Sequence, residues 1–186
     1  TMIEAIRMAL SRALEDDPDV VIFGEDVGID GGVFRATDGL MQRYGASRVR
    51  DTPLSETVIA GMAVGAAAHG LRPVAEMQFS GFSYLMIGQW EGNATRLRSR
   101  TQGQHTCPLV VRMPYGGGVR ALEHHSESRE ATYAHFPGGN VVIPSGPRNA
   151  RAIMLAAIRD PDPVVFMEPK HSYRSFREEV PEAEEV

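Results

Sequence analysis

The sequence predicts an α/β fold built on a doubly wound, mostly parallel sheet. Short continuous apolar runs bounded by turn residues occur at residues 20–23 and 109–113, and such runs are typical of strands buried on both faces of a parallel sheet. They alternate with segments whose apolar residues recur at helical spacing, which favours helices on both faces of the sheet. The chain has 186 residues, of which 42% are hydrophobic and 23% charged, so one substantial core is expected.

Each element is predicted from its periodicity and from the turn residues that bound it. Ile3, Ile6 and Leu10 share one face of the first helix, which ends at Pro18 and its acidic neighbours, and Ser145 is predicted to cap the last helix. The predicted helices cover residues 2–14, 36–44, 56–70, 80–100, 131–135 and 148–159. The predicted strands cover residues 20–23, 48–51, 74–79, 109–113, 140–144 and 164–169.

Residues 51–65 contain the first candidate functional group. Pro53 breaks the second strand and Ser55 is a favoured helix N-cap, so Glu56 falls in the first helical turn. The helix dipole stabilises a carboxylate there, so a purely structural acid is one interpretation. Residues 60–70 are almost only Gly, Ala and Val, which predicts a helix buried on several sides whose glycines admit a neighbouring backbone. An acid at the mouth of a buried helix is a candidate site residue.

The composition argues against several classes of partner. A net charge of −5 and the lack of a Lys/Arg block disfavour nucleic acid. The apolar run after Glu56 is shorter than the roughly 20 residues that a bilayer span needs, so no membrane association is expected. The first residues run into an amphipathic helix without a signal-peptide pattern, so we expect a cytoplasmic protein. The single cysteine, Cys107, lies in an apolar run and is expected to be a packed thiol rather than a nucleophile.

Other candidates follow the predicted strands at their carboxyl ends, where open α/β sheets bind ligands. Glu25 follows the first strand and is either a site residue or a solvated loop acid. Phe79, Phe82 and Tyr84 cluster at the end of the third strand, and aromatic groups of this kind are more often core. Residues 116–118 are a triple glycine, but neither GxGxxG nor GxxxxGK[ST] is present, so a flexible loop is favoured over a phosphate site.

Residues 123–128 form the most polar cluster of the chain. His124 and His125 are adjacent, so they cannot both face one point on a regular element, and no further ligand follows at a metal-binding spacing. Zinc is therefore not expected. A single proton-handling histidine is the functional interpretation of this cluster.

Four stretches, residues 51–56, 123–128, 134–138 and 166–170, together resemble the beta subunit of thiamin-diphosphate-dependent 2-oxo acid dehydrogenases. The pyruvate, branched-chain and acetoin dehydrogenase beta subunits share this pattern, and the resemblance covers nearly the whole chain in order. It implies the pyrimidine-binding domain of such a subunit, which contributes to oxidative decarboxylation of a 2-oxo acid and acyl transfer to lipoamide.

The resemblance implies a role for each candidate residue. Glu56 would hydrogen-bond a ring nitrogen of the cofactor's aminopyrimidine, promoting the imino tautomer whose nitrogen removes the thiazolium proton. Phe82 would pack against the aminopyrimidine, while Leu54 and Gln78 would line the pocket. Glu25 is similar to an acid that lies behind Glu56.

Further roles concern acyl transfer, ions and partners. His125 would handle protons as the acyl group passes to a lipoyl arm of the acyltransferase core. The diphosphate and magnesium signature of the family, a GDG followed by paired asparagines, is absent, as in beta subunits generally. An alpha subunit would therefore bind most of the magnesium and complete the site, next to a second beta subunit. Ala157, Asp160 and Asp162 resemble a loop that holds potassium in some members, although a bare turn is the alternative.

The domain organisation expected from the resemblance is a pyrimidine-binding domain over residues 1–174 and an acidic linker over residues 175–186 that leads to a missing C-terminal domain. Two alternative functions stay open. One is transketolase-like carbon transfer, whose enzymes carry both cofactor halves on one chain. The other is an assembly module without catalytic activity. The sequence does not identify the 2-oxo acid.

Overall fold

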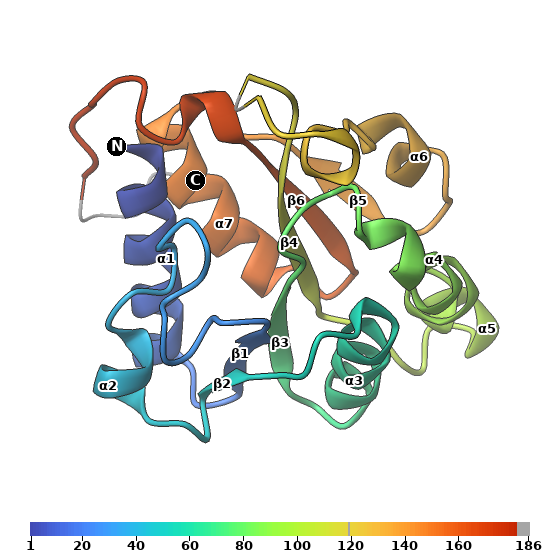
Figure 1. Ribbon diagram of the computed structural model, residues 1–186. Coiled ribbons are helices and arrows are strands. Elements are labelled where there is room, and N and C mark those ends of the chain that lie inside the picture. The colour runs from blue at the N-terminus through green and yellow to red at the C-terminus, as the bar shows by residue number, and fades with distance from the viewer. Residues whose placement is uncertain (119, 182–186) are drawn as a thin grey trace.

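The computed structural model describes residues 1–118 and 120–181, and these form a three-layer α/β domain (Figure 1). The described residues contain a six-stranded sheet in the order β2-β1-β3-β4-β6-β5, with every neighbouring pair parallel. The predicted doubly wound parallel fold is confirmed. The strands are β1 Val20–Gly24, β2 Val49–Asp51, β3 Arg72–Glu76, β4 Val110–Tyr115, β5 Asn140–Val142 and β6 Val164–Pro169.

Helices cover both faces of the sheet, as Figure 1 shows, with α1 and α7 on one side and α3 to α6 on the other. The α-helices are α1 Met2–Asp16, α2 Leu40–Tyr44, α3 Glu56–Ala68, α4 Ile87–Gln89, α5 Leu97–Arg100, α6 Glu130–Ala134 and α7 Pro147–Arg159. Shorter turns are the 3-10 helices η1 Ser83–Met86, η3 Glu123–His125 and η4 Lys170–Ser172, and the π-helical turn η2 Trp90–Ala94.

Alternation along the strands divides the core into two clusters. Val74, Val110 and Phe166 point toward α1 and α7, where the apolar faces of those helices meet the sheet. Their neighbours Ala75 and Val111 point to the opposite face and pack under α3 and the α4 to α5 segment. Successive side chains of a strand face opposite sides of the sheet, and helices cover both sides. Each central strand therefore has apolar residues at successive positions, which explains the continuous apolar runs in the sequence.

Three predicted elements differ from the structure. The helix predicted at 36–44 is only α2, because Gly39 adopts a left-handed φ of 79° and interrupts the helical backbone before Leu40. The helix predicted at 80–100 is a series of short 3-10, α and π turns in which Gly88 and Gly92 lower helix propensity. The third strand ends at Glu76 rather than at residue 79.

Two smaller predictions about helix ends and faces were wrong. The N-cap of α7 is Gly146 with Pro147 at the first helical position, whereas the Ser145 amide donates to the Asn149 Oδ1 atom at 3.0 Å. Helix α3 is not buried on several sides in this chain, since Val58 and Met62 are exposed. Its buried face is the set Glu56, Ile59, Ala60, Ala63 and Ala67.

Cys107 is buried, so the prediction of a packed thiol is confirmed, and burial raises the pKa of this thiol to about 12. None of the helices in the described part of the chain has the length and apolar character that crossing a bilayer requires. Residues 182–186, the end of the predicted acidic linker, lie outside the described residues.

Candidate active site

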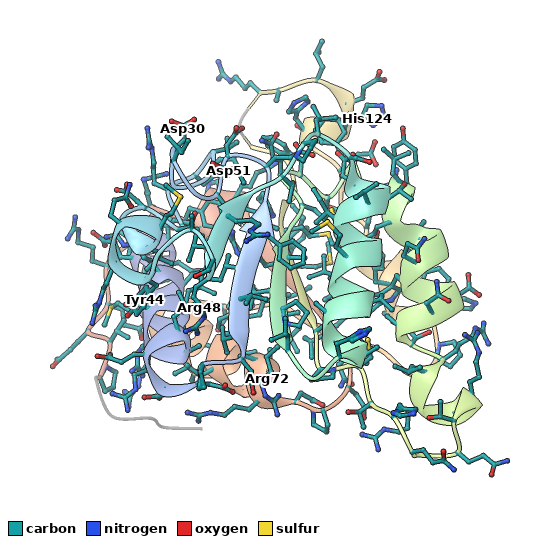
Figure 2. The ribbon with its side chains drawn as sticks, turned by 90° about the horizontal axis from the view of Figure 1, so that it is seen from below. Asp30, Tyr44, Arg48, Asp51, Arg72 and His124 are labelled. Carbon is teal, nitrogen blue, oxygen red and sulfur yellow. The ribbon has the colours of Figure 1, made fainter. Side chains whose placement is uncertain are left out.

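The parallel sheet brings the candidate residues to one edge. Glu25 follows β1, Glu56 follows β2 through a short turn, and Gln78 follows β3. The chain moves from β1 to β2 on one side and then to β3 on the other, so the topological switch point, at which open α/β sheets bind ligands, lies between β1 and β3. Figure 2 shows Asp51 at this carboxyl edge and Arg72 at the opposite edge.

Hydrogen bonds at this edge fix the loops that carry the acids. Asp51, the last residue of β2, accepts the Gly28 amide at 2.6 Å and the Ile29 amide at 3.1 Å, which clamps the loop after Glu25. The Thr52 amide donates to the Gly24 carbonyl at 2.9 Å, so the turn before Glu56 continues the sheet pairing by one residue.

Glu56 and Glu25 form a pair of buried carboxyl groups. Glu56 is the first residue of α3 and only 4% exposed, and Glu25 is 6% exposed. Burial, followed by the charges of Glu56 and Asp26, raises the pKa of Glu25 to about 7, and a backbone hydrogen bond from Ser55 opposes the rise. One Glu25 oxygen, Oε1, is buried and has no hydrogen-bond partner within the described residues. An unpartnered buried oxygen next to a second acid is typical of a functional site.

The rings of Phe79, Phe82 and His125 form an aromatic wall near the carboxyl end of β3. The Phe79 and Phe82 rings meet edge to face at 6.0 Å, and the His125 ring lies 4.6 Å from Phe79 and 5.1 Å from Phe82. The first turn of α3 is tied to the segment that follows Phe82, because the Thr57 hydroxyl donates to the Leu85 carbonyl at 2.7 Å. The wall therefore connects α3 to residues 123–128, which we call the histidine segment.

Both adjacent histidine rings contact Phe82, because the backbone at His124 is not helical, but their other partners differ. His125 packs on Phe79 and Phe82, whereas His124 lies against Phe82 and Tyr84 and pairs with the Glu127 carboxylate at 3.2 Å. Figure 2 places His124 at the same edge of the sheet as Asp51.

The histidine segment packs tightly on its neighbours. A Cβ atom at Gly81 would lie 2.0 Å from the His124 carbonyl oxygen, so glycine is required there. The Glu127 carbonyl accepts both the Ser80 hydroxyl at 2.7 Å and the Gly116 amide at 2.9 Å. These contacts hold residues 123–128 over the end of β3.

Gln78 and Leu54 lie at the same edge of the sheet, in the segments that follow β3 and β2. The Gln78 side-chain amide donates to the Asp26 carboxylate at 2.9 Å. Leu54 is 79% exposed and lies in the turn before Ser55, the N-cap of α3. Val58 and Met62 are exposed one helical turn apart within α3, and we call these two residues the apolar face of α3.

The loop predicted to hold potassium lies at the opposite, amino edge of the sheet, between α7 and β6. Asp160 accepts the Asp162 amide at 2.8 Å, and the Asp162 carboxylate accepts Arg98 Nε at 2.7 Å, while Ala157 is buried in α7. Within the described residues, no three or more His, Cys, Asp or Glu side chains form a group that could hold a metal ion. Potassium at this loop stays a prediction.

Sequence reasoning missed a buried charge cluster below the site. Arg112 of β4 donates to both Glu168 oxygens at 2.7 Å and to Glu76, and the Tyr173 hydroxyl donates to Glu168. Burial acts to lower the pKa of Arg112, but the negative charges of Glu168 and Glu76 raise it, and the net shift is upward. Burial also raises the pKa of Glu76, to about 7. The available signal was one buried charged residue in each of the three strands β3, β4 and β6.

A concavity of about 500 Å³ lies elsewhere, between α1 and α2, and contains none of the predicted site residues. Its lining includes Arg7, Arg12, Glu15 and Arg43, and Arg12 and Arg43 pair with Asp16 and Glu15. This surface is therefore a set of exposed ion pairs rather than a second candidate site.

Comparisons with known proteins agree with this geometry. Residues 1–175 match the family described as transketolase, pyrimidine binding domain. The chain is 53% identical over 179 residues to the pyruvate dehydrogenase E1 component subunit beta of Mycoplasma pneumoniae. The aligned residues cover 96% of this chain and 55% of that relative. The chain is 51% identical over 184 residues to the Bacillus subtilis protein of the same name, which is 99% of this chain and 57% of the relative.

A solved structure described as a split gene transketolase, inactive beta4 tetramer, matches with a TM-score of 0.68 at 19% identity, over 88% of this chain and 49% of that one. At this identity the likeness concerns the fold alone. The chain spans about half the length of the curated relatives named above. Its sequence and its fold identify it as a member of the transketolase pyrimidine-binding domain family.

Proposed function

We propose that this chain supplies the aminopyrimidine-binding half of a thiamin diphosphate site, as the beta subunit of a 2-oxo acid dehydrogenase. The observation that carries this proposal is the pair of buried carboxyls, Glu25 and Glu56, at the switch point of the sheet. The curated relatives at 51% and 53% identity are named pyruvate dehydrogenase E1 subunit beta, which favours pyruvate over a branched-chain or acetoin-type substrate.

The residues at this edge fit an aminopyrimidine ring. A buried acid at a helix N-terminus offers a carboxyl group for a ring nitrogen, and the aromatic wall offers an apolar surface for the ring. When bound, thiamin diphosphate supplies a nucleophilic ring carbon that attacks the 2-oxo group. Leu54 is exposed and Gln78 hydrogen-bonds Asp26 at the same edge of the sheet, where each would contact the cofactor or the partner chain.

Each acid has a distinct proposed role. Glu56 accepts or donates a proton in a hydrogen bond to the pyrimidine nitrogen. Glu25, whose raised pKa makes it partly protonated near neutral pH, shares the buried space without imposing a second full negative charge. His125, held between Phe79 and Phe82, handles a proton during acyl transfer to a lipoyl group of the acyltransferase core.

An alpha subunit would complete the site and bind most of the magnesium. The apolar face of α3 supports a partner chain at this edge, because exposed apolar side chains beside a candidate site are typical of an interface. A second beta subunit belongs to the same proposal. Residues 1–174 would be the pyrimidine-binding domain, and residues 175–186 would lead to the C-terminal domain of a full-length subunit in the cytoplasm.

The test is turnover by the full-length chain assembled with its alpha partner, thiamin diphosphate and magnesium. Glu56→Gln is expected to lower pyruvate turnover by a factor of about 10² to 10⁴. The matched control is Glu91→Gln, which alters a surface acid paired with Arg96 and leaves turnover unchanged. Normal turnover by the Glu56 variant would falsify the assigned role. A transketolase-like function predicts instead that ketol transfer between sugar phosphates exceeds pyruvate decarboxylation.

A further inference from the structure

Lys170 is the sole lysine among the 19 Lys and Arg residues of the chain, and it is buried, with 5% of its surface exposed. Arginine has a planar, forked guanidinium, whereas lysine carries a compact ammonium with three donors on a flexible stem. All the remaining Lys and Arg positions of the chain are arginines, so Lys170 provides the one lysine ammonium, and it lies at a buried position. Lys170 begins η4, directly after β6.

The ammonium of Lys170 touches the histidine segment in two ways. Its Nζ atom donates a hydrogen bond to the His125 backbone carbonyl. The same atom lies 5.1 Å from the centroid of the Phe79 ring, which is a cation–π distance, and the Phe79 ring lies 4.6 Å from the His125 ring. Lys170 thus contacts the backbone of His125 directly and its imidazole through Phe79.

The two ends of this contact differ in rigidity. Lys170 is anchored by β6, a buried strand paired on both sides. His125 lies in the short η3 turn, downstream of a stretch with three consecutive glycines, and its amide donates to Leu122 at a long 3.3 Å. The hydrogen bond to the His125 carbonyl therefore ties a loop residue to the sheet.

A structural role alone does not explain a lysine here. Burial lowers the pKa of Lys170, and within the described residues no carboxylate lies at ion-pair distance from its ammonium. A buried charge without a carboxylate partner is destabilising, and an apolar side chain of the same length would avoid that cost. Residues that reduce stability in this way are expected at functional sites.

We propose that Lys170 is a positioning residue for His125, fixing the backbone and the aromatic support of the imidazole at the edge of the sheet. This inference rests on the proposed function, because it assigns His125 a role in acyl transfer. It adds a residue that acts through the His125 carbonyl and the Phe79 ring.

The experiment uses the full-length chain assembled with its alpha partner. Lys170→Met keeps an unbranched side chain of similar length and removes the ammonium. If the methionine variant does not assemble, Lys170→Gln, which has a neutral amide donor group instead of the ammonium, is used in its place. The matched control, Arg177→Met, removes an exposed cation from the same C-terminal segment. Two steps are measured separately: decarboxylation of pyruvate with a dye as electron acceptor, and acylation of a free lipoyl domain.

We expect Lys170→Met to lower kcat for acylation about tenfold while KM for the lipoyl domain and the dye-coupled rate change by less than about twofold. Combined with His125→Ala, it is expected to cause no further loss, because both changes remove the same function. Unchanged acylation, or a further tenfold loss in the double variant, would overturn the positioning role.

A second readout does not require activity. In the assembled protein without thiamin diphosphate, diethylpyrocarbonate modification of His125 is followed by mass spectrometry, with the exposed His105 as internal reference. Release of the loop in Lys170→Met is expected to raise His125 modification several-fold relative to His105, and equal modification would contradict the inference. If His125→Ala acylates lipoyl domains normally, the proposed function of His125 fails; if only Lys170→Met behaves as wild type, this inference alone fails.

Discussion

Glu25→Gln tests the electrostatics of the candidate site through protein stability. The pKa of Glu25 rises from 4.5 to about 7 on folding, chiefly because the carboxyl is buried, so the folded chain resists its ionisation. Glutamine keeps the size of the side chain and cannot ionise. The substitution therefore removes the free energy that ionising a buried acid costs at alkaline pH.

The sign and size follow from proton linkage. A raised folded pKa means that the folded state binds more protons than the unfolded state between pH 4.5 and about 7. The contribution of Glu25 to stability is therefore fully present below pH 4.5 and is lost as pH rises through about 7. A shift of this size corresponds to at most about 3 kcal/mol, and relaxation of the carboxyl toward water reduces the expected difference to roughly 2 kcal/mol.

The assay is urea unfolding of the wild type and of Glu25→Gln at about pH 5 and about pH 8. We expect the variant to be more stable by roughly 2 kcal/mol at the higher pH and close to the wild type at the lower one. Glu15→Gln, an exposed acid paired with Arg43, is the control and should show no such dependence. An identical difference at both pH values, or a less stable variant at the higher one, would refute the reasoning.

The other predictions concern the charge cluster and the histidine segment. Arg112→Met leaves Glu76 and Glu168 without their buried partner and should lower the free energy of unfolding by about 3–5 kcal/mol. The loss should be larger at alkaline pH, where Glu76 is ionised. A loss below about 1 kcal/mol in urea unfolding would contradict this prediction. Gly81→Ala places a Cβ atom against the His124 carbonyl and should lower the free energy of unfolding by about 1–3 kcal/mol and speed proteolysis near residue 124. Unchanged unfolding and cleavage rates would show that glycine is not required at this contact.

The sheet and the place of Glu56 could be predicted because their signals are local. Apolar runs bounded by turn residues define five of the strands without reference to tertiary contacts. Pro53 and Ser55 set the start of α3 in the same way, which places Glu56 in its first turn. The parallel pairing then brings Glu25 and Gln78 to the same edge.

Other features depend on long-range contacts that the sequence does not reveal. Arg112 is one charged residue in an apolar strand, and only the strand order shows that Glu76 and Glu168 lie on either side of it. The hydrogen bond from Lys170 to His125 joins residues 45 positions apart. Composition also misled at α3: a helix of Gly, Ala and Val predicts burial on several sides, yet the chain leaves Val58 exposed.

The central claim is that this chain holds only half of a thiamin diphosphate site. Calorimetric titration of thiamin diphosphate with magnesium into the full-length chain alone, into its alpha partner alone and into their mixture tests this directly. We expect clear binding by the mixture and none by the full-length chain alone. Tight binding by that chain alone would contradict the shared site, and no binding by the mixture would favour an assembly module without activity.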